Sequence, residues 1–211
     1  MSEKKRIAVC MALSWDYVPS QFFLSYNALR DYTESTGEYV FDIVVARSVW
    51  IDTMRDICAE RAMEMKPDYI LWLDVDQTYP HFTARKLVKH IDDGCLVVAG
   101  VTPDRVLESN NILKFGGKAG VCRDDDFEVN RGLVKIDSVG FGGIMTHPSV
   151  FEKIGYPRFQ RNWIEGDKGS YYRHGEDTVF HEKCKEAGID VWCDTDLHYG
   201  HMALREIQVY Q

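Results

Sequence analysis

The sequence has no Cys-x-x-Cys pair, although it contains six cysteines. A zinc knuckle and a thioredoxin-like redox motif both need such a pair, so neither is present. The cysteines stand singly within apolar stretches, where a free thiol behaves as a small hydrophobic side chain. Unpaired cysteines are typical of a reducing compartment, and the sequence therefore predicts a cytoplasmic protein.

Long hydrophobic runs are also missing. No stretch approaches the roughly 20 apolar residues that a membrane-spanning helix needs. The N-terminus, with Lys4-Lys5-Arg6 before a short apolar segment, looks like the start of a signal peptide. However, Trp15 and Asp16 stand where small residues should precede the cleavage site. The apolar segment is therefore predicted to be a core strand.

Positive charge is scarce, since the 211 residues carry a formal net charge of −8. This balance argues against non-specific binding to DNA or to an anionic membrane, and there is no strong nucleic-acid signal. A local basic groove on an acidic protein stays compatible with it. The length suits one domain, residues 1–211, and neither an internal repeat nor a low-complexity tract interrupts it.

Apolar runs alternate with amphipathic stretches along the first half of the chain. The runs predict strands at 6–13, 39–46, 69–75, 95–102 and 189–197. Helical spacing predicts helices at 20–35, 52–66, 83–94, 148–155 and 176–188. We expect a hairpin or loop at 103–132, a strand interrupted by glycines at 133–147, and irregular chain at 156–174. The alternation predicts an α/β fold with a mainly parallel central sheet flanked by helices.

The stretch YILWLDVDQTYP (69–80) ends an apolar strand with Asp74 and Asp76. In open α/β sheets, ligands bind beyond the carboxyl ends of the strands. Residues two apart in a strand point to the same side, so both carboxylates are expected to face one site. Two like charges repel unless a cation lies beside them, and Mg²⁺ or Mn²⁺ suits carboxylate ligands. The alternative is that two aspartates fall together by chance in an acidic chain.

Three segments together resemble GT-A-type glycosyltransferases, especially the small family-2-like ones. MRDICAERAMEMKPDYILWLDVD (54–76) is similar to their helix and D-x-D strand. VGFGGIMTHPSVFEKIG (139–155) and GEDTVFHEKCKEAGIDVWCDTDLHYGH (175–201) resemble two later segments in the same order. Each motif is degenerate alone, but the ordered set covers about residues 40–201. The resemblance implies a single GT-A (Rossmann-like) domain.

The resemblance implies a metal-dependent transferase, using Mn²⁺ or Mg²⁺. A sugar would pass from a nucleotide-diphosphate sugar donor to an unknown hydroxyl acceptor. Inversion is the expected outcome, and retention stays the alternative, because GT-A folds host both. Asp76 would be a direct metal ligand and His201 would complete the metal site, while Asp74 would hold the ribose or a metal-bound water. Asp177 would be the general base, and Glu176 would orient the acceptor or the base.

Four further positions carry open interpretations. Arg55 is expected near the nucleotide or the D-x-D strand, or else in a surface salt bridge; many relatives have Arg-Asn where this chain has Arg55-Asp56. Gly142 and Gly143 either let the backbone approach the donor or acceptor, or mark a bulge. His198 rivals His201 as the metal ligand.

Other functions and simpler explanations stay open. Glu176 and Asp177 begin a helix, where the dipole favours acids anyway. His174, Asp177 and His181 could form a metallohydrolase site. A nucleotidyltransferase would use the same D-x-D, metal and nucleotide, but the basic glycine-rich loop that often follows its first strand is missing. A non-catalytic nucleotide-sugar-binding protein is the fourth reading. The aromatic segment 156–175 is either an acceptor-binding loop or a lid packed on the core.

Overall fold

A seven-stranded sheet forms the centre of the protein. The computed structural model describes residues 3–13, 17–48, 50–104, 110–115, 121–165 and 171–202. Its strands are β1 (Lys5–Leu13), β2 (Tyr39–Arg47), β3 (Tyr69–Trp72), β4 (Gln77–Thr78), β5 (Val97–Val101), β6 (Ile112–Phe115), β7 (Val121–Arg123), β8 (Leu133–Ile136), β9 (Ser138–Val139), β10 (Ile144–Thr146), β11 (Asn162–Glu165), β12 (Tyr171–His174), β13 (Val191–His198) and β14 (Gly200–His201). The helices are α1 (Ser20–Glu34), α2 (Ile51–Glu64), α3 (Thr83–Asp92), α4 (Ser149–Lys153) and α5 (Glu176–Glu186).

The order of strands in the central sheet is β2-β1-β3-β10-β5-β13-β8. Strands β2, β1, β3, β5 and β13 run in one direction, whereas β10 and β8 run antiparallel to their neighbours. The predicted α/β class and the largely parallel sheet are confirmed. The reversed strands make the sheet mixed, which the apolar pattern did not predict.

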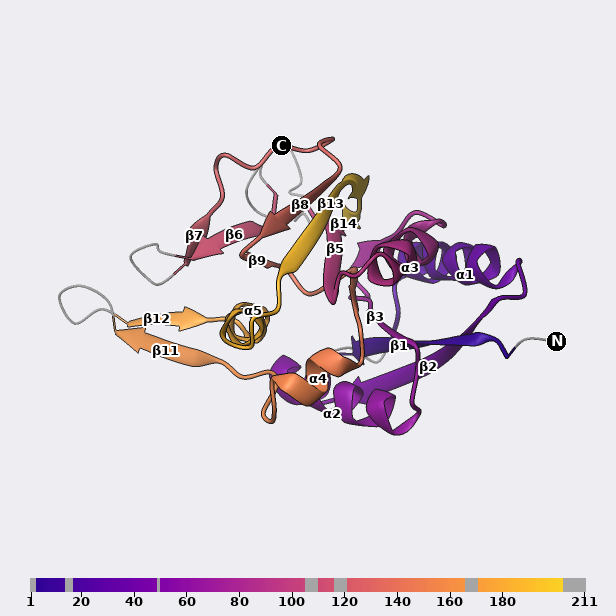
Figure 1. Ribbon diagram of the computed structural model, residues 1–211, viewed down its shortest axis with the longest axis horizontal. Helices are drawn as coiled ribbons and strands as arrows, with labels where there is room; N and C mark the ends of the chain where they lie inside the picture. The colour runs from indigo at the N-terminus through magenta and orange to yellow at the C-terminus, as the bar shows by residue number, and fades with distance from the viewer. Residues whose placement is uncertain are drawn as a thin grey trace, which may run out of the picture.

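Helices cover both faces of the sheet (Figure 1). Helices α1 and α3 pack on one face through Phe22, Leu29 and Leu87, while α2, α4 and α5 pack on the other through residues such as Met54 and Phe151. Strand β3 is buried on both faces, because successive side chains enter the two cores alternately. This explains why YILW reads as an unbroken apolar run.

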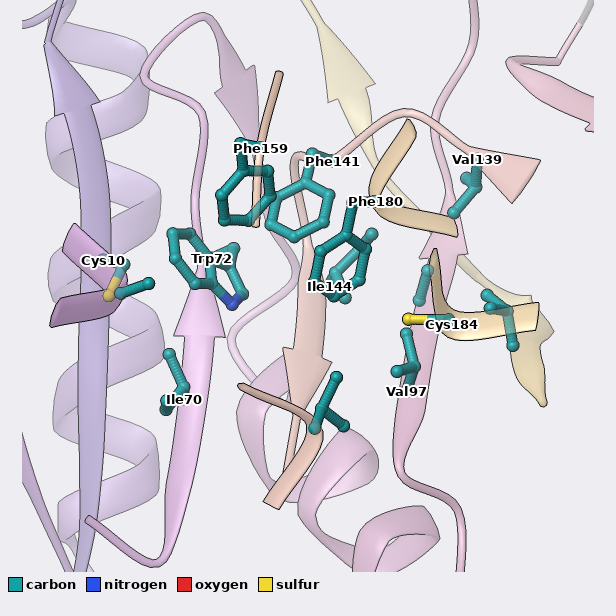
Figure 2. Close-up of a cluster of buried hydrophobic side chains, with 14 of the residues drawn as sticks. Cys10, Ile70, Trp72, Val97, Val139, Phe141, Ile144, Phe159, Phe180 and Cys184 are labelled. Carbon is teal, nitrogen blue, oxygen red and sulfur yellow. The ribbon is translucent and has the colours of Figure 1, made fainter. Parts of the chain in front are cut away.

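Aromatic side chains fill the core between β3 and α5. Figure 2 shows Trp72, Phe141, Phe159 and Phe180 gathered on this face of the sheet. The ring of Phe141 lies 5.1 Å from Trp72, 4.9 Å from Phe159 and 4.8 Å from Phe180, measured between centroids, in edge-to-face contacts. Such pairs are favourable and restrict ring motion. The cluster thus fixes the start of α5 against the end of β3.

The segments predicted to be irregular contain two hairpins. Strands β6 and β7 pair within the 103–132 segment, as the hairpin alternative predicted. The prediction of irregular chain at 156–174 is wrong in part, because β11 and β12 form an antiparallel pair there. Its residues 166–170 lie outside the described part of the chain. A hairpin that does not pack on the core needs no alternation of apolar and polar residues. Hydrophobic periodicity therefore does not predict its strands.

The sequence predicted free cysteines and the absence of a membrane-spanning helix, and the described residues can be compared with both predictions. Among these residues, no helix has both the length and the apolar character required to span a membrane. Cys10, Cys58, Cys95, Cys184 and Cys193 are buried free thiols. The cytoplasmic location itself stays a prediction.

Candidate functional site

Asp74 and Asp76 lie in a turn beyond the end of β3. The strand stops at Trp72, and the backbone N–H of Gln77 donates to the Asp74 carbonyl oxygen at 3.3 Å. The buried Tyr79 hydroxyl accepts a hydrogen bond from the Asp74 N–H at 2.9 Å. Strand alternation therefore does not orient the two carboxylates in the way that the sequence predicted, because neither of them stands in a strand. The turn still keeps the two carboxylates close enough to interact. Burial raises the pKa of Asp74, and the negative charge of Asp76 raises it further, whereas the positive charge of Arg55 lowers it.

Arg55 enters the site from α2 and is 6% exposed. Its Nη2 atom lies 3.4 Å from both carboxylate oxygens of Asp74, and its Nε lies 3.3 Å from Glu176 Oε1. The guanidinium also lies over the ring of Phe141, 4.6 Å from the centroid. The alternative of a surface salt bridge is therefore wrong. A contact between Arg55 and a nucleotide stays a prediction.

Glu176 and Asp177 form the first turn of α5. Glu176 lies between two arginines, since its second carboxylate oxygen is 3.8 Å from Arg161 Nε. Asp177 is half-buried, and its Oδ1 accepts the Thr178 N–H at 2.7 Å. Burial raises the pKa of Asp177 to about 6, the Glu176 charge adds to the rise, and Arg55 opposes it. This carboxyl group can therefore exchange a proton close to neutral pH.

His201 approaches Asp76 from β14, which pairs with β4 directly after the D-x-D turn. Its Nε2 lies 3.6 Å from Asp76 Oδ2, and the Met202 N–H donates to the Asp76 carbonyl at 2.8 Å. The Nδ1 atom lies 2.8 Å from the Pro103 carbonyl oxygen. Because a carbonyl only accepts, Nδ1 carries the proton, as in many metal-bound histidines. In the neutral ring, Nε2 then presents its lone pair on the Asp76 side.

The donors at Asp76 and His201 fit a divalent cation that is shared with a substrate. A carboxylate oxygen and an imidazole nitrogen both suit Mn²⁺. In the described part of the chain, no three His, Cys, Asp or Glu side chains are grouped closely enough to hold a metal by themselves. Such an ion commonly takes one or two protein ligands and completes its shell with phosphate oxygens and water. Asp74, paired with Arg55, is less suited to direct coordination.

Gly142 and Gly143 have a packing role. A Cβ at Gly142 would overlap the side chain of Gln77, and one at Gly143 would overlap the ring of Tyr199. Gly143 also has a φ of +80°, which glycine adopts without strain. Other side chains of the protein occupy the space beside these glycines, and this packing alone is enough to require glycine. A contact between either glycine and a donor or acceptor stays a prediction.

His198 and Asp56 have other partners. His198 Nε2 lies 2.8 Å from the Thr195 carbonyl, whereas His201 lies beside Asp76. Asp56 Oδ1 accepts the backbone N–H groups of Arg158 and Phe159 at 3.0 and 3.3 Å. An acidic residue after Arg55 is thus explained by its contacts with the chain after α4.

The histidines of the metallohydrolase alternative do not converge. His174 Nδ1 lies 3.0 Å from Glu182 Oε1, and His181 Nδ1 lies 3.1 Å from Ser138 Oγ. Burial lowers the pKa of His181 to about 3, and the nearby Arg55 lowers it further. These two rings are therefore held by different partners, and the structure does not support a metal site between them.

Sequence reasoning missed two residues of the site. The Tyr79 hydroxyl accepts a hydrogen bond from the Asp74 N–H in the D-x-D turn, and Arg161 contacts Glu176. Tyr79 belongs to the quoted stretch, but an aromatic residue there reads as ordinary core. Arg161 stands in a segment with no periodic pattern, and nothing local marks its partner.

No protein-family model matches the chain, and no curated protein is significantly similar to it in sequence. Many solved structures share its fold, including the following two. A197 from STIV superposes with a TM-score of 0.60 at 18% identity, over 94% of this chain and 85% of that chain. GalNAc-T7, solved with UDP, GalNAc and Mn²⁺, superposes with a TM-score of 0.62 at 11% identity, over 94% of this chain and 43% of that chain.

These identities show the fold alone, and this chain spans less than half the length of the GalNAc-T7 chain. The α/β arrangement, with its mixed sheet and flanking helices, matches a Rossmann-like GT-A fold. The fold class predicted from the sequence is therefore confirmed.

Proposed function

We propose that the chain is a metal-dependent glycosyltransferase, which moves a sugar from a nucleotide-diphosphate sugar to a hydroxyl acceptor. The observation that carries the proposal is the convergence of Asp74 and Glu176 on the buried Arg55, with Asp177 beside them. This cluster lies beyond the carboxyl end of β3, where α/β sheets bind ligands. A fold neighbour solved with UDP, GalNAc and Mn²⁺ supports the same class of reaction.

Asp177 acts as the general base. A carboxylate with a pKa of about 6 is ionised at neutral pH and is more basic than an ordinary aspartate. It takes the proton of the acceptor hydroxyl as that oxygen attacks the anomeric carbon. The bond from this carbon to the diphosphate oxygen breaks, and its electron pair leaves with the diphosphate. Attack from the face opposite the leaving group inverts the anomeric centre.

The other residues position the donor and the base. Asp76 and His201 would hold Mn²⁺ or Mg²⁺, whose positive charge stabilises the departing diphosphate. Asp74, fixed by Arg55 and by the Tyr79 hydroxyl, is placed to accept hydrogen bonds from the ribose. Glu176, between Arg55 and Arg161, keeps the start of α5 and therefore Asp177 in place.

Nucleoside diphosphate binding tests the proposal. The protein is melted with UDP, GDP, ADP or CDP, each with Mn²⁺ and with EDTA. One nucleotide should stabilise the fold only with Mn²⁺, by about 2.7 kcal/mol when it is present at 100 times its Kd. Asp76→Asn should lose this gain and still fold. Asp93→Asn, at an exposed position after α3, is the matched control and should keep it. The absence of a Mn²⁺-dependent shift with all four nucleotides would contradict the proposal.

A further inference from the structure

The hairpin of β11 and β12 projects from the body of the protein beside α5 (Figure 1). Only Gly175 separates the end of β12 at His174 from the start of α5 at Glu176. In the described part of the chain, the two strands pair with each other and with no strand of the central sheet. The hairpin therefore extends the surface of the molecule outward from the proposed catalytic carboxylates.

One face of this hairpin carries exposed aromatic and charged side chains. The register pairs Trp163 with Arg173, and Glu165 with Tyr171. Directly opposed residues and residues two apart share a face, so these four side chains lie on the same side. Trp163 is 68% exposed and Tyr171 is 63% exposed. The guanidinium of Arg173 lies 5.8 Å from the Trp163 ring centroid. We call Trp163, Tyr171 and Arg173 the aromatic platform.

A second ring and guanidinium connect the base of the hairpin to the carboxylates. Arg161, next to β11, lies 6.0 Å from the ring centroid of Trp50, which is 57% exposed at the start of α2. Its Nε lies 3.8 Å from Glu176 Oε2. Two aromatic–arginine pairs therefore occur along the hairpin and at its base, and the inner pair contacts Glu176, the residue before the proposed base.

The chemistry of these side chains matches a carbohydrate. An aromatic ring offers a flat apolar face to the C–H groups of a sugar ring, while the neighbouring guanidinium donates hydrogen bonds to its hydroxyl groups. A stable protein interface generally needs a broad, well-packed patch of about 1,000 Å² or more, whereas here Arg173 and Glu165 occupy the two positions of the face beside the rings. The net charge of −8 and the presence of Glu165 on the same face disfavour a nucleic acid.

We propose that the aromatic platform binds an oligosaccharide acceptor. The terminal sugar presents its hydroxyl to Asp177, and the sugar units behind it stack on Trp163 and Tyr171. This inference rests on the proposed function and adds the class of its acceptor. It also predicts that a single sugar binds more weakly than a chain, because a chain makes additional contacts with the platform.

The test measures binding of defined oligosaccharides by saturation-transfer NMR. The probes are series of glucose, N-acetylglucosamine, mannose and galactose oligomers from one to six units. At least one series should bind, with an affinity that rises with chain length. Trp163→Ala and Tyr171→Ala should each raise its Kd about tenfold, because truncation of an aromatic anchor removes a large part of binding energy. The Mn²⁺-dependent nucleotide shift should not change in either variant.

The control is Phe23→Ala, which removes a similarly exposed ring (57%) from α1, in the helix layer on the other face of the sheet. It should leave both kinds of binding unchanged. The inference is overturned if no oligosaccharide binds, if only monosaccharides bind, if a protein proves to be the acceptor, or if the platform variants bind like the parent. Nucleotide binding with Mn²⁺ in the same samples then shows that the proposed function stands. Oligosaccharide binding through the platform without any nucleotide binding would instead remove the proposed function.

Discussion

The Nε atom of Arg55 lies 3.3 Å from Glu176 Oε1, and this contact joins α2 to the first residue of α5. The same guanidinium lies 3.4 Å from Asp74 at the end of β3. One buried cation therefore holds together carboxylates from two distant segments, which would otherwise repel each other. The ring of Phe141 below it belongs to the aromatic core, so the site is built directly on the best-packed part of the protein.

Removal of the Arg55 charge should destabilise the fold. Arg55→Met leaves the buried Glu176 and the partly exposed Asp74 without their cation, and loss of one partner from a buried ion pair typically costs about 3–5 kcal/mol. Urea unfolding measures the change in the free energy of unfolding. Arg61→Met is the control on the same helix, because the Arg61 guanidinium donates to the Val45 carbonyl at the surface. Its cost should stay within about 1.5 kcal/mol. Equal losses in the two variants would show that Arg55 does not act as a buried counter-ion.

Asp177 should lower the stability of the protein at neutral pH. Its folded-state pKa of about 6 lies above the ordinary value of 3.8, so the folded state binds the proton more tightly than the unfolded state. Stability from this group is fully present below pH 3.8 and is lost as the pH rises through about 6. Asp177→Asn should therefore stabilise the fold at pH 7 by about 1–3 kcal/mol, while transfer is abolished and nucleotide binding is kept. Thermal unfolding at pH 7 and at pH 4 measures the difference, which should shrink at the lower pH. Loss of nucleotide binding or full transfer by the variant would move the role of base elsewhere.

The rate of transfer should follow the protonation of the same carboxyl group. As the pH falls below about 6, Asp177 gains a proton and no longer accepts one from the acceptor, so kcat/KM should fall about tenfold for each further pH unit. Arg55→Lys should move this acid limb to higher pH, since a lysine ammonium reaches the site less well and opposes the pKa rise more weakly. A rate profile with its acid limb near pH 4 would mean that an ordinary, exposed carboxylate is the base.

Much of the fold could be predicted because its strands and helices have recognisable patterns of apolar residues over short stretches of sequence. Strands β1 and β3 are buried on both faces and therefore appear as continuous apolar runs. The reversed strand β10 could not be predicted in this way. Its direction depends on pairing of Ile144 with Trp72 on one side and with Ala99 on the other, and these partners lie far away in the chain.

The same distinction applies to the site. Asp74 was singled out because a carboxylate after an apolar strand is visible in a few neighbouring residues. Asp177 was singled out through the resemblance to GT-A-type glycosyltransferases, because an acid at the start of a helix is common for other reasons. Arg161 was missed, because its contact with Glu176 depends on how the hairpin leaves α4 and returns to α5. The role of Arg55 was only partly visible, since its burial between two carboxylates is a property of the packed core.

His201 should be required for Mn²⁺-dependent nucleotide binding, whereas His198 should not. His201→Gln removes the nitrogen that faces Asp76, and it should abolish or strongly reduce the Mn²⁺-dependent thermal shift. His198→Gln is the matched control, because the His198 Nε2 atom lies 2.8 Å from the Thr195 carbonyl. Isothermal titration of the nucleotide, with and without Mn²⁺, measures both effects. If His198→Gln loses the shift and His201→Gln keeps it, the assignment of the two histidines is reversed.

Gly143 should tolerate alanine much less well than Gly188 does. Both have positive φ values, +80° and +70°, so each substitution carries the cost of a left-handed backbone, about 1–2 kcal/mol. At Gly188 a Cβ would meet open space, whereas at Gly143 it would overlap the Tyr199 ring. The Tyr199 hydroxyl donates to the Gly143 carbonyl at 2.9 Å, so the ring cannot move away without losing this bond.

The loss in the free energy of unfolding for Gly143→Ala should therefore be at least about twice that for Gly188→Ala, because overpacking adds about 1–3 kcal/mol to the backbone strain. Tyr199 stands two residues before His201, so its displacement should also weaken the Mn²⁺-dependent nucleotide shift, which Gly188→Ala should leave intact. Equal losses in stability would mean that only the backbone conformation requires glycine at 143. A normal nucleotide shift in a destabilised Gly143→Ala protein would mean that Tyr199 moves without carrying β14, and that the position of His201 depends on its pairing with β4 alone.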